Sequence, residues 1–151
     1  MARIMNTPDN KSVLRRYLEL MTRGPIEELP SIVAENVTGY DGNDRVAGLA
    51  AIVSHARDAQ AGCQDLRVEV EHMIEEGEWV AFFGVTSGRQ TGALFGMTRS
   101  DREFRVQGMA MARVRDGKIA EIRTGWDTLS FAQQLGAMTS SPMTNRLRTD
   151  V

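Results

Sequence analysis

The spacing of apolar residues changes once along this chain, near residue 65. In the first part, apolar residues recur at the intervals of a helix, and the stripe at about 10–22 consists of Val13, Leu14, Tyr17, Leu18 and Met21. Pro25 suits the first turn of a second, short helix. Gly48 then opens a third helix, at about 49–59. The pattern therefore predicts three helices before the first long strand.

In the second part, apolar and polar residues alternate, which is the pattern of half-buried strands. The main predicted strands cover 66–74, 79–87, 103–115 and 118–125, and a shorter strand and loop lie at 35–44. Within that shorter segment, 41–44 has the composition of a turn, and a helical turn is expected at 129–135. Helices followed by antiparallel strands predict an α+β fold, with the helices on one face of a curved, mostly antiparallel sheet.

Asp116-Gly117 marks a tight hairpin, because a two-residue type I′ turn needs positive φ at both central positions. Successive side chains then alternate between the two faces of the sheet. One face is predicted to carry Phe104, Val106, Gly108, Ala110, Ala112, Val114, Ile119, Glu121, Arg123, Gly125 and Asp127. The other carries an apolar patch suited to a dimer interface, formed by Met109, Met111, Ile122 and Trp126. A β-bulge anywhere in 104–127 would exchange these faces.

Small residues at the centre of the first face leave room for a cavity, the usual form of a small-molecule site. Arg123 and Asp127 are expected to project into it. Each has a structural alternative, since Asp127 is a preferred N-cap for the following helix and Arg123 can pair with Glu121. Candidate substrate-binding residues are Tyr17, Tyr40, His55, Phe83, Phe95, Phe104, Val106, Ala110 and Trp126.

The chain of 151 residues is long enough for one domain that encloses a cavity, expected at 1–136 with a tail at 137–151. A net charge of −2 without a basic patch argues against a nucleic-acid partner. Cys63 is the sole cysteine, and the two histidines lack the spacing of a metal site. Without an apolar run of membrane length or a signal-peptide pattern, a cytoplasmic location is expected.

Several motifs, in this order, resemble the SnoaL-like polyketide cyclase family. They are DLRVEVEHMIEEGEWVAF at 65–82, GALFGM at 92–97, RVRDGKIAE at 113–121, an aspartate at 127 and QQLG at 133–136. The resemblance covers about 10–137. It implies a cone-shaped α+β barrel of the nuclear-transport-factor-2 (NTF2) type, with a deep pocket between helices and sheet, and usually a dimer.

The resemblance also implies enzymes that act on aromatic polyketides in antibiotic biosynthesis, with no metal or organic cofactor. Their acid/base is an aspartate, and Asp127 stands in the matching place. This chain departs from the pattern because it has no histidine after His72 and has Arg123 where the family favours tryptophan. An arginine beside an aspartate suits stabilisation of an enolate or phenolate while the aspartate moves a proton, which fits the family's hydroxylation-associated branch or an epoxide-opening chemistry in a similar cone fold rather than plain aldol cyclisation.

Three functions stay open at this stage. The first is a cyclase or hydroxylase-associated enzyme that modifies a ring of an anthraquinone-type polyketide. The second is an epoxide hydrolase or isomerase of the same fold, and the third is a non-catalytic small-molecule-binding module. The expected partners are an aromatic substrate, a second copy of the chain in a homodimer, and a separate reductase if the enzyme takes part in hydroxylation.

Overall fold

The structure, a computed structural model, describes residues 9–138. In chain order the elements are α1 (Asn10–Thr22), the 3₁₀ turn η1 (Ile26–Glu28), α2 (Leu29–Ile32), β1 (Val33–Asp41), β2 (Asp44–Ala47), α3 (Leu49–Gly62), β3 (Cys63–Glu76), β4 (Trp79–Gln90), β5 (Glu103–Arg115), β6 (Lys118–Trp126) and α4 (Thr128–Gln134). The predicted tail lies outside the described residues from 139 onward.

The six strands form one sheet in the order β2-β1-β6-β5-β4-β3. All neighbouring strands are antiparallel except β1 and β6, which run parallel. The predicted α+β fold with a mostly antiparallel sheet is confirmed. The expected barrel is open in the described part of the chain, where β2 and β3 are the sheet edges.

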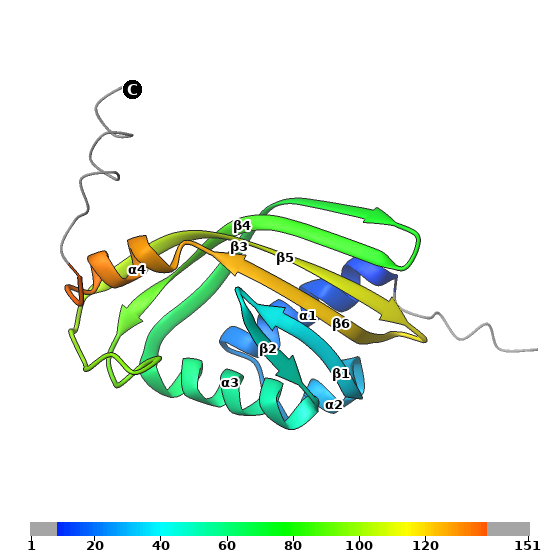
Figure 1. The fold of residues 1–151 in the computed structure, drawn as a ribbon, viewed down its shortest axis with the longest axis horizontal. Helices are drawn as coiled ribbons and strands as arrows, with labels where there is room; N and C mark the ends of the chain where they lie inside the picture. The colour runs from blue at the N-terminus through cyan, green and yellow to red at the C-terminus, as the bar shows by residue number, and fades with distance from the viewer. Residues whose placement is uncertain (1–8, 139–151) are drawn as a thin grey trace, which may run out of the picture.

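Helices α1, α2 and α3 gather on one side of the sheet, and α4 follows β6 at the end of the sheet (Figure 1). The prediction of three N-terminal helices was slightly off, because the second splits into η1 and α2, and the β1–β2 hairpin separates it from α3. Asp9 caps α1, its carboxylate accepting a hydrogen bond from the Ser12 backbone N–H at 2.7 Å.

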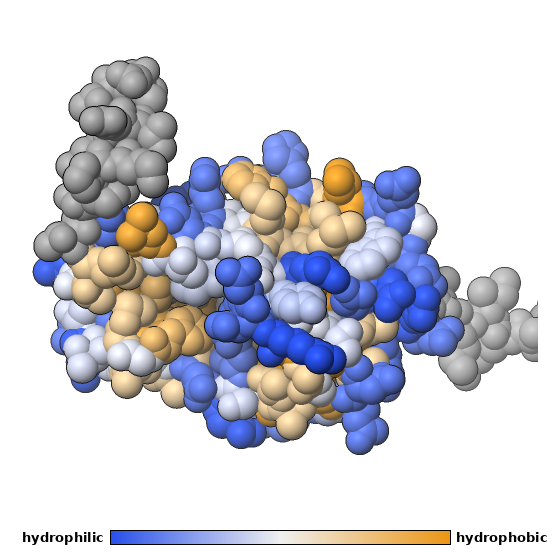
Figure 2. Space-filling model, in the orientation of Figure 1, coloured by the Kyte–Doolittle hydropathy of each residue, from blue (hydrophilic) through white to orange (hydrophobic). Residues whose placement is uncertain are grey.

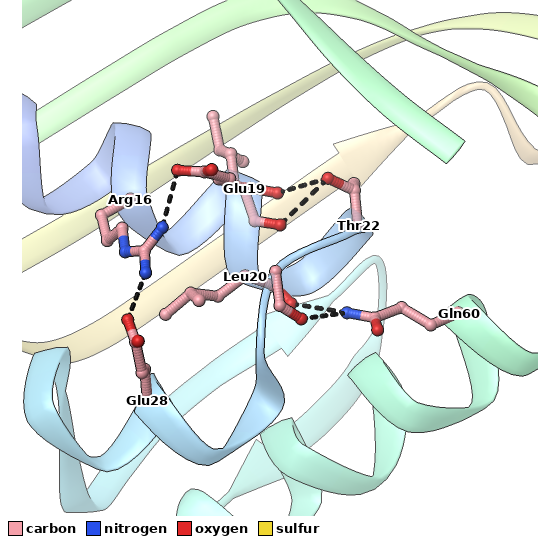
Figure 3. Close-up of polar contacts among 8 residues, drawn as sticks. Arg16, Glu19, Leu20, Thr22, Glu28 and Gln60 are labelled. Carbon is pink, nitrogen blue, oxygen red and sulfur yellow. Dashed lines mark hydrogen bonds and ion pairs between the residues drawn. The ribbon is translucent and has the colours of Figure 1, made fainter. Parts of the chain in front are cut away.

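A side-chain amide holds α1 and α3 together. The Nε2 group of Gln60 in α3 donates to the carbonyl oxygens of Leu20 at 2.8 Å and Gly24 at 3.2 Å, just where α1 ends (Figure 3). These bonds satisfy carbonyl groups that a helix leaves without partners at its C-terminus. On the other side of α1, Arg16 pairs with Glu19 and Glu28 (Figure 3). These contacts join the helical segments of this layer to one another.

The hairpin between β5 and β6 has the predicted turn, with φ of 51° at Asp116 and 75° at Gly117. Arg115 pairs with Lys118 as expected. A bulge follows at once, because Val114 pairs with Ile119 whereas Arg113 pairs with Glu121. One extra residue in β6 exchanges its faces from there on. The predicted faces are therefore right for β5 and wrong for β6 beyond the bulge.

We call the face that packs against α1 the inner face and the opposite one the outer face. The inner face carries Ala110, Ala112 and Val114 from β5 beside Ile119 and Ile122 from β6. These side chains form the main core with α1. A second cluster lies toward α4 and consists of Ala59, Leu66, Leu94, Phe104, Val106, Phe131 and Leu135. The space between the two clusters is where the cavity lies.

Candidate functional site

A cavity of about 290 Å³ lies between the helices and the inner face of the sheet. Its wall combines residues of α1, α3 and α4, of all six strands, and of the loop between β4 and β5. On the face shown in Figure 2, apolar side chains gather over the space between α3 and α4. The volume lies near the lower end of the range for small-molecule sites, roughly 300 Å³ upward.

Eight of the nine predicted substrate-binding residues line this cavity: Tyr17, Tyr40, His55, Phe95, Phe104, Val106, Ala110 and Trp126. The ninth, Phe83, lies elsewhere, in a groove of the outer face with Met109 and Met111. The phenylalanine of β4 that reaches the cavity is its neighbour Phe82. Contact of these residues with a substrate stays a prediction.

Asp41 is the carboxylate of this cavity, and it comes from the last residue of β1. Its Oδ1 accepts a hydrogen bond from the indole Nε1 of Trp126 at 3.2 Å. Its register partner on β6 is Thr124, whose side chain also lines the cavity. The close approach of β1 to β6 that brings them together requires glycine at 39, where a Cβ atom would lie 1.7 Å from the Ile122 carbonyl oxygen. Within residues 9–138 the other oxygen of Asp41 makes no hydrogen bond, so it is available to a ligand.

Tyr17 brings a phenol from α1 to the same cavity, and the residue is only 6% exposed. Burial raises the pKa of this phenol above its ordinary value, and the negative charge of Asp41 raises it further. Tyr17 therefore stays protonated across the physiological range. Within residues 9–138 its hydroxyl makes no hydrogen bond, so it is free to donate one to a ligand oxygen.

Aromatic rings line the end of the cavity toward α4. The Trp126 ring lies edge-on to Phe131 at 5.0 Å between centroids, and Phe131 lies edge-on to Phe104 at 4.8 Å. Phe95 continues the series, 6.0 Å from Trp126, and stacks on His55 at 5.1 Å. Such pairs contribute about 0.5–1.5 kcal/mol each beyond the area they bury. The rings form a stable wall that suits a flat, apolar ligand.

Arg123 and Asp127 do not line the cavity. The bulge places Arg123 on the outer face, opposite Met111, where its guanidinium lies 5.0 Å from the Tyr40 ring and pairs with Glu121 at 2.9 Å. The prediction that it faces the pocket was wrong. Asp127 is exposed and caps α4, its Oδ1 accepting from the Ser130 backbone N–H at 2.9 Å. The structural alternatives named for both residues are observed, and catalysis by either stays a prediction.

Sequence reasoning missed Asp41 because it stands in a run of turn-forming residues, Asp41-Gly42-Asn43-Asp44. In the structure, strand β1 extends through Asp41 and β2 begins at Asp44. The bulge shows in the burial pattern of the structure, since Ile119 and Ile122 are both buried. Two buried residues three apart cannot share one face of a regular strand.

Other chemistry has less support in the described residues. Burial raises the pKa of the Cys63 thiol to about 11, so it is a poor nucleophile at neutral pH. Within residues 9–138, no three side chains of the kinds that bind metals lie close enough to share an ion. No helix in this part of the chain has the length and apolar character needed to cross a membrane.

The structure has an α+β fold of the NTF2-like class, with an inner cavity lined by aromatic rings, one carboxylate and one buried phenol. The family model of the SnoaL-like polyketide cyclases matches residues 11–135. The chain belongs to this family, as the sequence motifs indicated.

Two curated relatives are cyclases from Streptomyces. Nogalonic acid methyl ester cyclase of Streptomyces nogalater is 36% identical over 73 residues, which are 48% of this chain and 54% of that protein. The chain thus matches about half the length of that relative. Aklanonic acid methyl ester cyclase DnrD of Streptomyces peucetius is 27% identical over 126 residues, 83% of this chain and 78% of that protein.

The fold is also that of a solved structure, a SnoaL-like polyketide cyclase from Agrobacterium tumefaciens. The two superpose with a TM-score of 0.71 at 19% identity, over 85% of this chain and 99% of the other. At this level of identity the likeness concerns the fold alone.

Proposed function

We propose that this chain is an enzyme that closes or modifies a ring of an aromatic polyketide by acid/base chemistry in the inner cavity. The observation that carries the proposal is the meeting of Asp41 and Tyr17 in a cavity otherwise dominated by apolar and aromatic side chains. Membership of the polyketide cyclase family supports the same conclusion. The substrate class that we propose is the methyl ester of a polyketide acid, because the names of both curated relatives state such substrates.

An intramolecular aldol reaction is the chemistry that these groups serve best. The free oxygen of Asp41 removes a proton from a carbon beside a carbonyl group, and the resulting enolate carbon attacks a second carbonyl of the same molecule. A carbon–carbon bond forms, and the carbonyl oxygen takes the negative charge. That oxygen then receives the proton that Asp41 removed. Electrons and atoms balance within the substrate, so the step consumes no co-reactant.

Each group has a distinct part in this scheme. Trp126 fixes the orientation of Asp41 through the indole hydrogen bond at 3.2 Å. Tyr17, which stays protonated, donates a hydrogen bond to the oxygen on which charge develops. The aromatic wall formed by Phe95, Trp126 and Phe131 holds the rings of the substrate flat and excludes water. Positioning of the two reacting carbons is a large part of the rate enhancement expected for such a reaction.

The decisive experiment compares substitutions at two aspartates, Asp41, which lines the cavity, and Asp127, which caps α4 outside it. We expect Asp41→Asn to lower turnover of nogalonic or aklanonic acid methyl ester by roughly 10²-fold or more, because the amide cannot accept the proton. Asp127→Asn should stay within a few-fold of the wild type, because asparagine is also a good N-cap for α4. Affinity for an anthraquinone, measured by calorimetry, should change little in both variants.

The opposite result would assign the acid/base to Asp127, as the family pattern implies, and would refute our assignment to Asp41. Unchanged turnover in both variants would refute a carboxylate mechanism, and binding without turnover in the wild type would favour the binding module. Incorporation of ¹⁸O from O₂ into the product would identify the hydroxylation-associated function, for which a separate reductase is the expected partner. Incorporation of ¹⁸O from water would favour the epoxide hydrolase.

We also propose that the chain forms a homodimer through the outer face. Met109 and Met111 are 56% and 43% exposed there, and Ile74 is 70% exposed. Ile122 and Trp126, the other two members of the predicted interface, lie on the inner side instead. The revised interface therefore consists of the methionines of β5 with Ile74 of β3 and Phe83 of β4.

A further inference from the structure

The loop between β4 and β5 carries a tight turn at Leu94–Met97. The Leu94 backbone N–H donates to the Met97 carbonyl at 3.0 Å, and the Met97 N–H donates to the Leu94 carbonyl at 2.9 Å. The two central residues, Phe95 and Gly96, have φ of 49° and 78°. This is the conformation of a type I′ turn, for which glycine, asparagine and aspartate are the usual residues.

Phe95 is out of place in that conformation. Among residues 9–138, the other non-glycine residues with positive φ are all aspartates, Asp65, Asp101 and Asp116. Aspartate tolerates the left-handed region because its short side chain can bond locally, whereas a bulky side chain there is a true outlier. Backbone strain of this kind persists only where the surrounding structure imposes it, and it is often found at ligand sites.

The residues at the base of the loop hold Phe95 in this strained backbone conformation. Leu94 is 3% exposed and packs in the cluster near α4. Gln90 is completely buried, and its Nε2 group donates to the carbonyl oxygens of Met97 at 3.3 Å and Thr98 at 3.1 Å. The turn is thus anchored on both sides of Phe95. Phe95 itself is 45% exposed, so burial of its ring does not explain the strained backbone.

The position of the Phe95 ring accounts for the strained backbone. The Phe95 ring lies against His55 of α3, with centroids 5.1 Å apart and planes 21° apart, and it lines the cavity. Trp126 stands 6.0 Å away from it on the inner side. The ring therefore has a polar aromatic partner in His55 and lines the cavity, at a point that remains open to solvent.

We propose that Phe95 is a specificity-determining residue, whose ring is held by the strained turn as a stacking surface for one flat ring of the ligand. His55 supports the ring from behind, and Trp126 bounds the same ligand ring from within. The inference rests on the proposed function in one respect, that the ligand is aromatic. The ring of Phe95 selects flat polycyclic ligands over saturated ligands of similar size.

The test measures affinity for a dihydroxyanthraquinone and for a saturated tricyclic alcohol by calorimetry, with the wild type and Phe95→Leu. Leucine keeps an apolar side chain and the strained backbone but removes the π-face. We expect the anthraquinone dissociation constant to rise by up to about tenfold. The stacking free energy of an aromatic pair reaches the value that corresponds to a tenfold change in affinity. The dissociation constant of the saturated ligand should stay within about twofold.

Two further variants separate the ring from the turn. Phe95→Gly should melt about 2–4 °C above Phe95→Ala, because both lack the ring but only glycine adopts positive φ without strain. Asp116→Gly is the matched control, since it changes a positive-φ residue of the β5–β6 hairpin, which is not part of the cavity lining. Its affinity for the anthraquinone should equal that of the wild type.

An unchanged anthraquinone affinity in Phe95→Leu, or an equal loss for both ligands, would refute the inference while leaving the proposed function intact. A wild-type protein that binds the saturated ligand but no anthraquinone would refute both. A wild-type protein that binds neither would also refute both, because the cavity would not then accept a polycyclic ligand at all.

Discussion

Tyr17→Phe is the change whose consequences follow most directly from the structure. It removes one hydroxyl oxygen from a side chain that is 6% exposed, and that hydroxyl has no hydrogen-bond partner within residues 9–138. The free energy of unfolding at pH 7 should therefore change by less than about 1 kcal/mol. The same hydroxyl is the proposed donor to the charged oxygen of the transition state, so turnover should fall by roughly 10²–10³-fold.

The pH dependence gives an independent measure. The pKa of Tyr17 is raised in the folded protein, by burial first and by Asp41 second. Below the ordinary tyrosine pKa of about 10, the phenol is protonated in both states and contributes no pH dependence. Above it, the unfolded chain releases the proton whereas the folded protein keeps it, so stability falls as pH rises. From pH 9 to pH 11, the wild type should lose about 1.4 kcal/mol more than Tyr17→Phe.

Urea unfolding followed by circular dichroism at pH 9, 10 and 11 measures this difference, with anthraquinone affinity at pH 7 as the check on the cavity. The variant is its own control, because every other titrating group is common to both proteins. An identical loss of stability in the two proteins would show that Tyr17 ionises as freely in the folded state as in the unfolded one. A variant with full turnover would remove Tyr17 from the proposed mechanism.

Substitutions at two neighbouring residues of β5 should affect different properties, ligand binding for one and dimerisation for the other, because the residues face opposite sides of the sheet. Ala110→Leu extends a side chain into the cavity and should weaken anthraquinone binding at least tenfold. The free energy of unfolding should change by less than the roughly 1–3 kcal/mol usual for overpacking, because the cavity has room for the larger side chain. Binding that persists would place the ligand elsewhere. Met111→Lys puts a charge on the outer face and should convert the proposed homodimer to a monomer in light scattering without loss of fold; an unchanged mass would exclude this face as the interface.

Much of the fold followed from local sequence signals. The stripe of Val13, Leu14 and Tyr17 predicted α1, and these residues are buried against the sheet. Asp116-Gly117 predicted a type I′ turn and the pairing of its flanking residues. The small residues Ala110 and Ala112 were correctly placed on the core side of β5. For the helix and the turn as local elements, the signal and the conformation that it determines lie within a few residues of each other.

The errors have equally physical causes. The extra residue of the bulge, Ala120, looks like any other in the alternation, yet it moves Arg123 to the outer face and Trp126 to the cavity. Asp41 was hidden because turn composition at 41–44 does not show that β1 reaches residue 41. Its role depends on the parallel pairing of β1 with β6, which joins segments that lie about eighty residues apart. No local pattern encodes that pairing.

The same pairing sets the order in which the protein is completed. The hydrogen bond from Trp126 to Asp41 spans 85 positions of the chain, and β1 has no sheet partner except β2 until β6 arrives. Contacts between such distant segments bear the largest loop-closure entropy and form late in folding. A nascent chain that ends at the β5–β6 turn therefore has its three N-terminal helices and three long strands, but it lacks β6, the strand that joins β1 and its Asp41 to the rest of the sheet. The cavity is therefore completed only after β6 and the following α4, which contributes Phe131, have been synthesised.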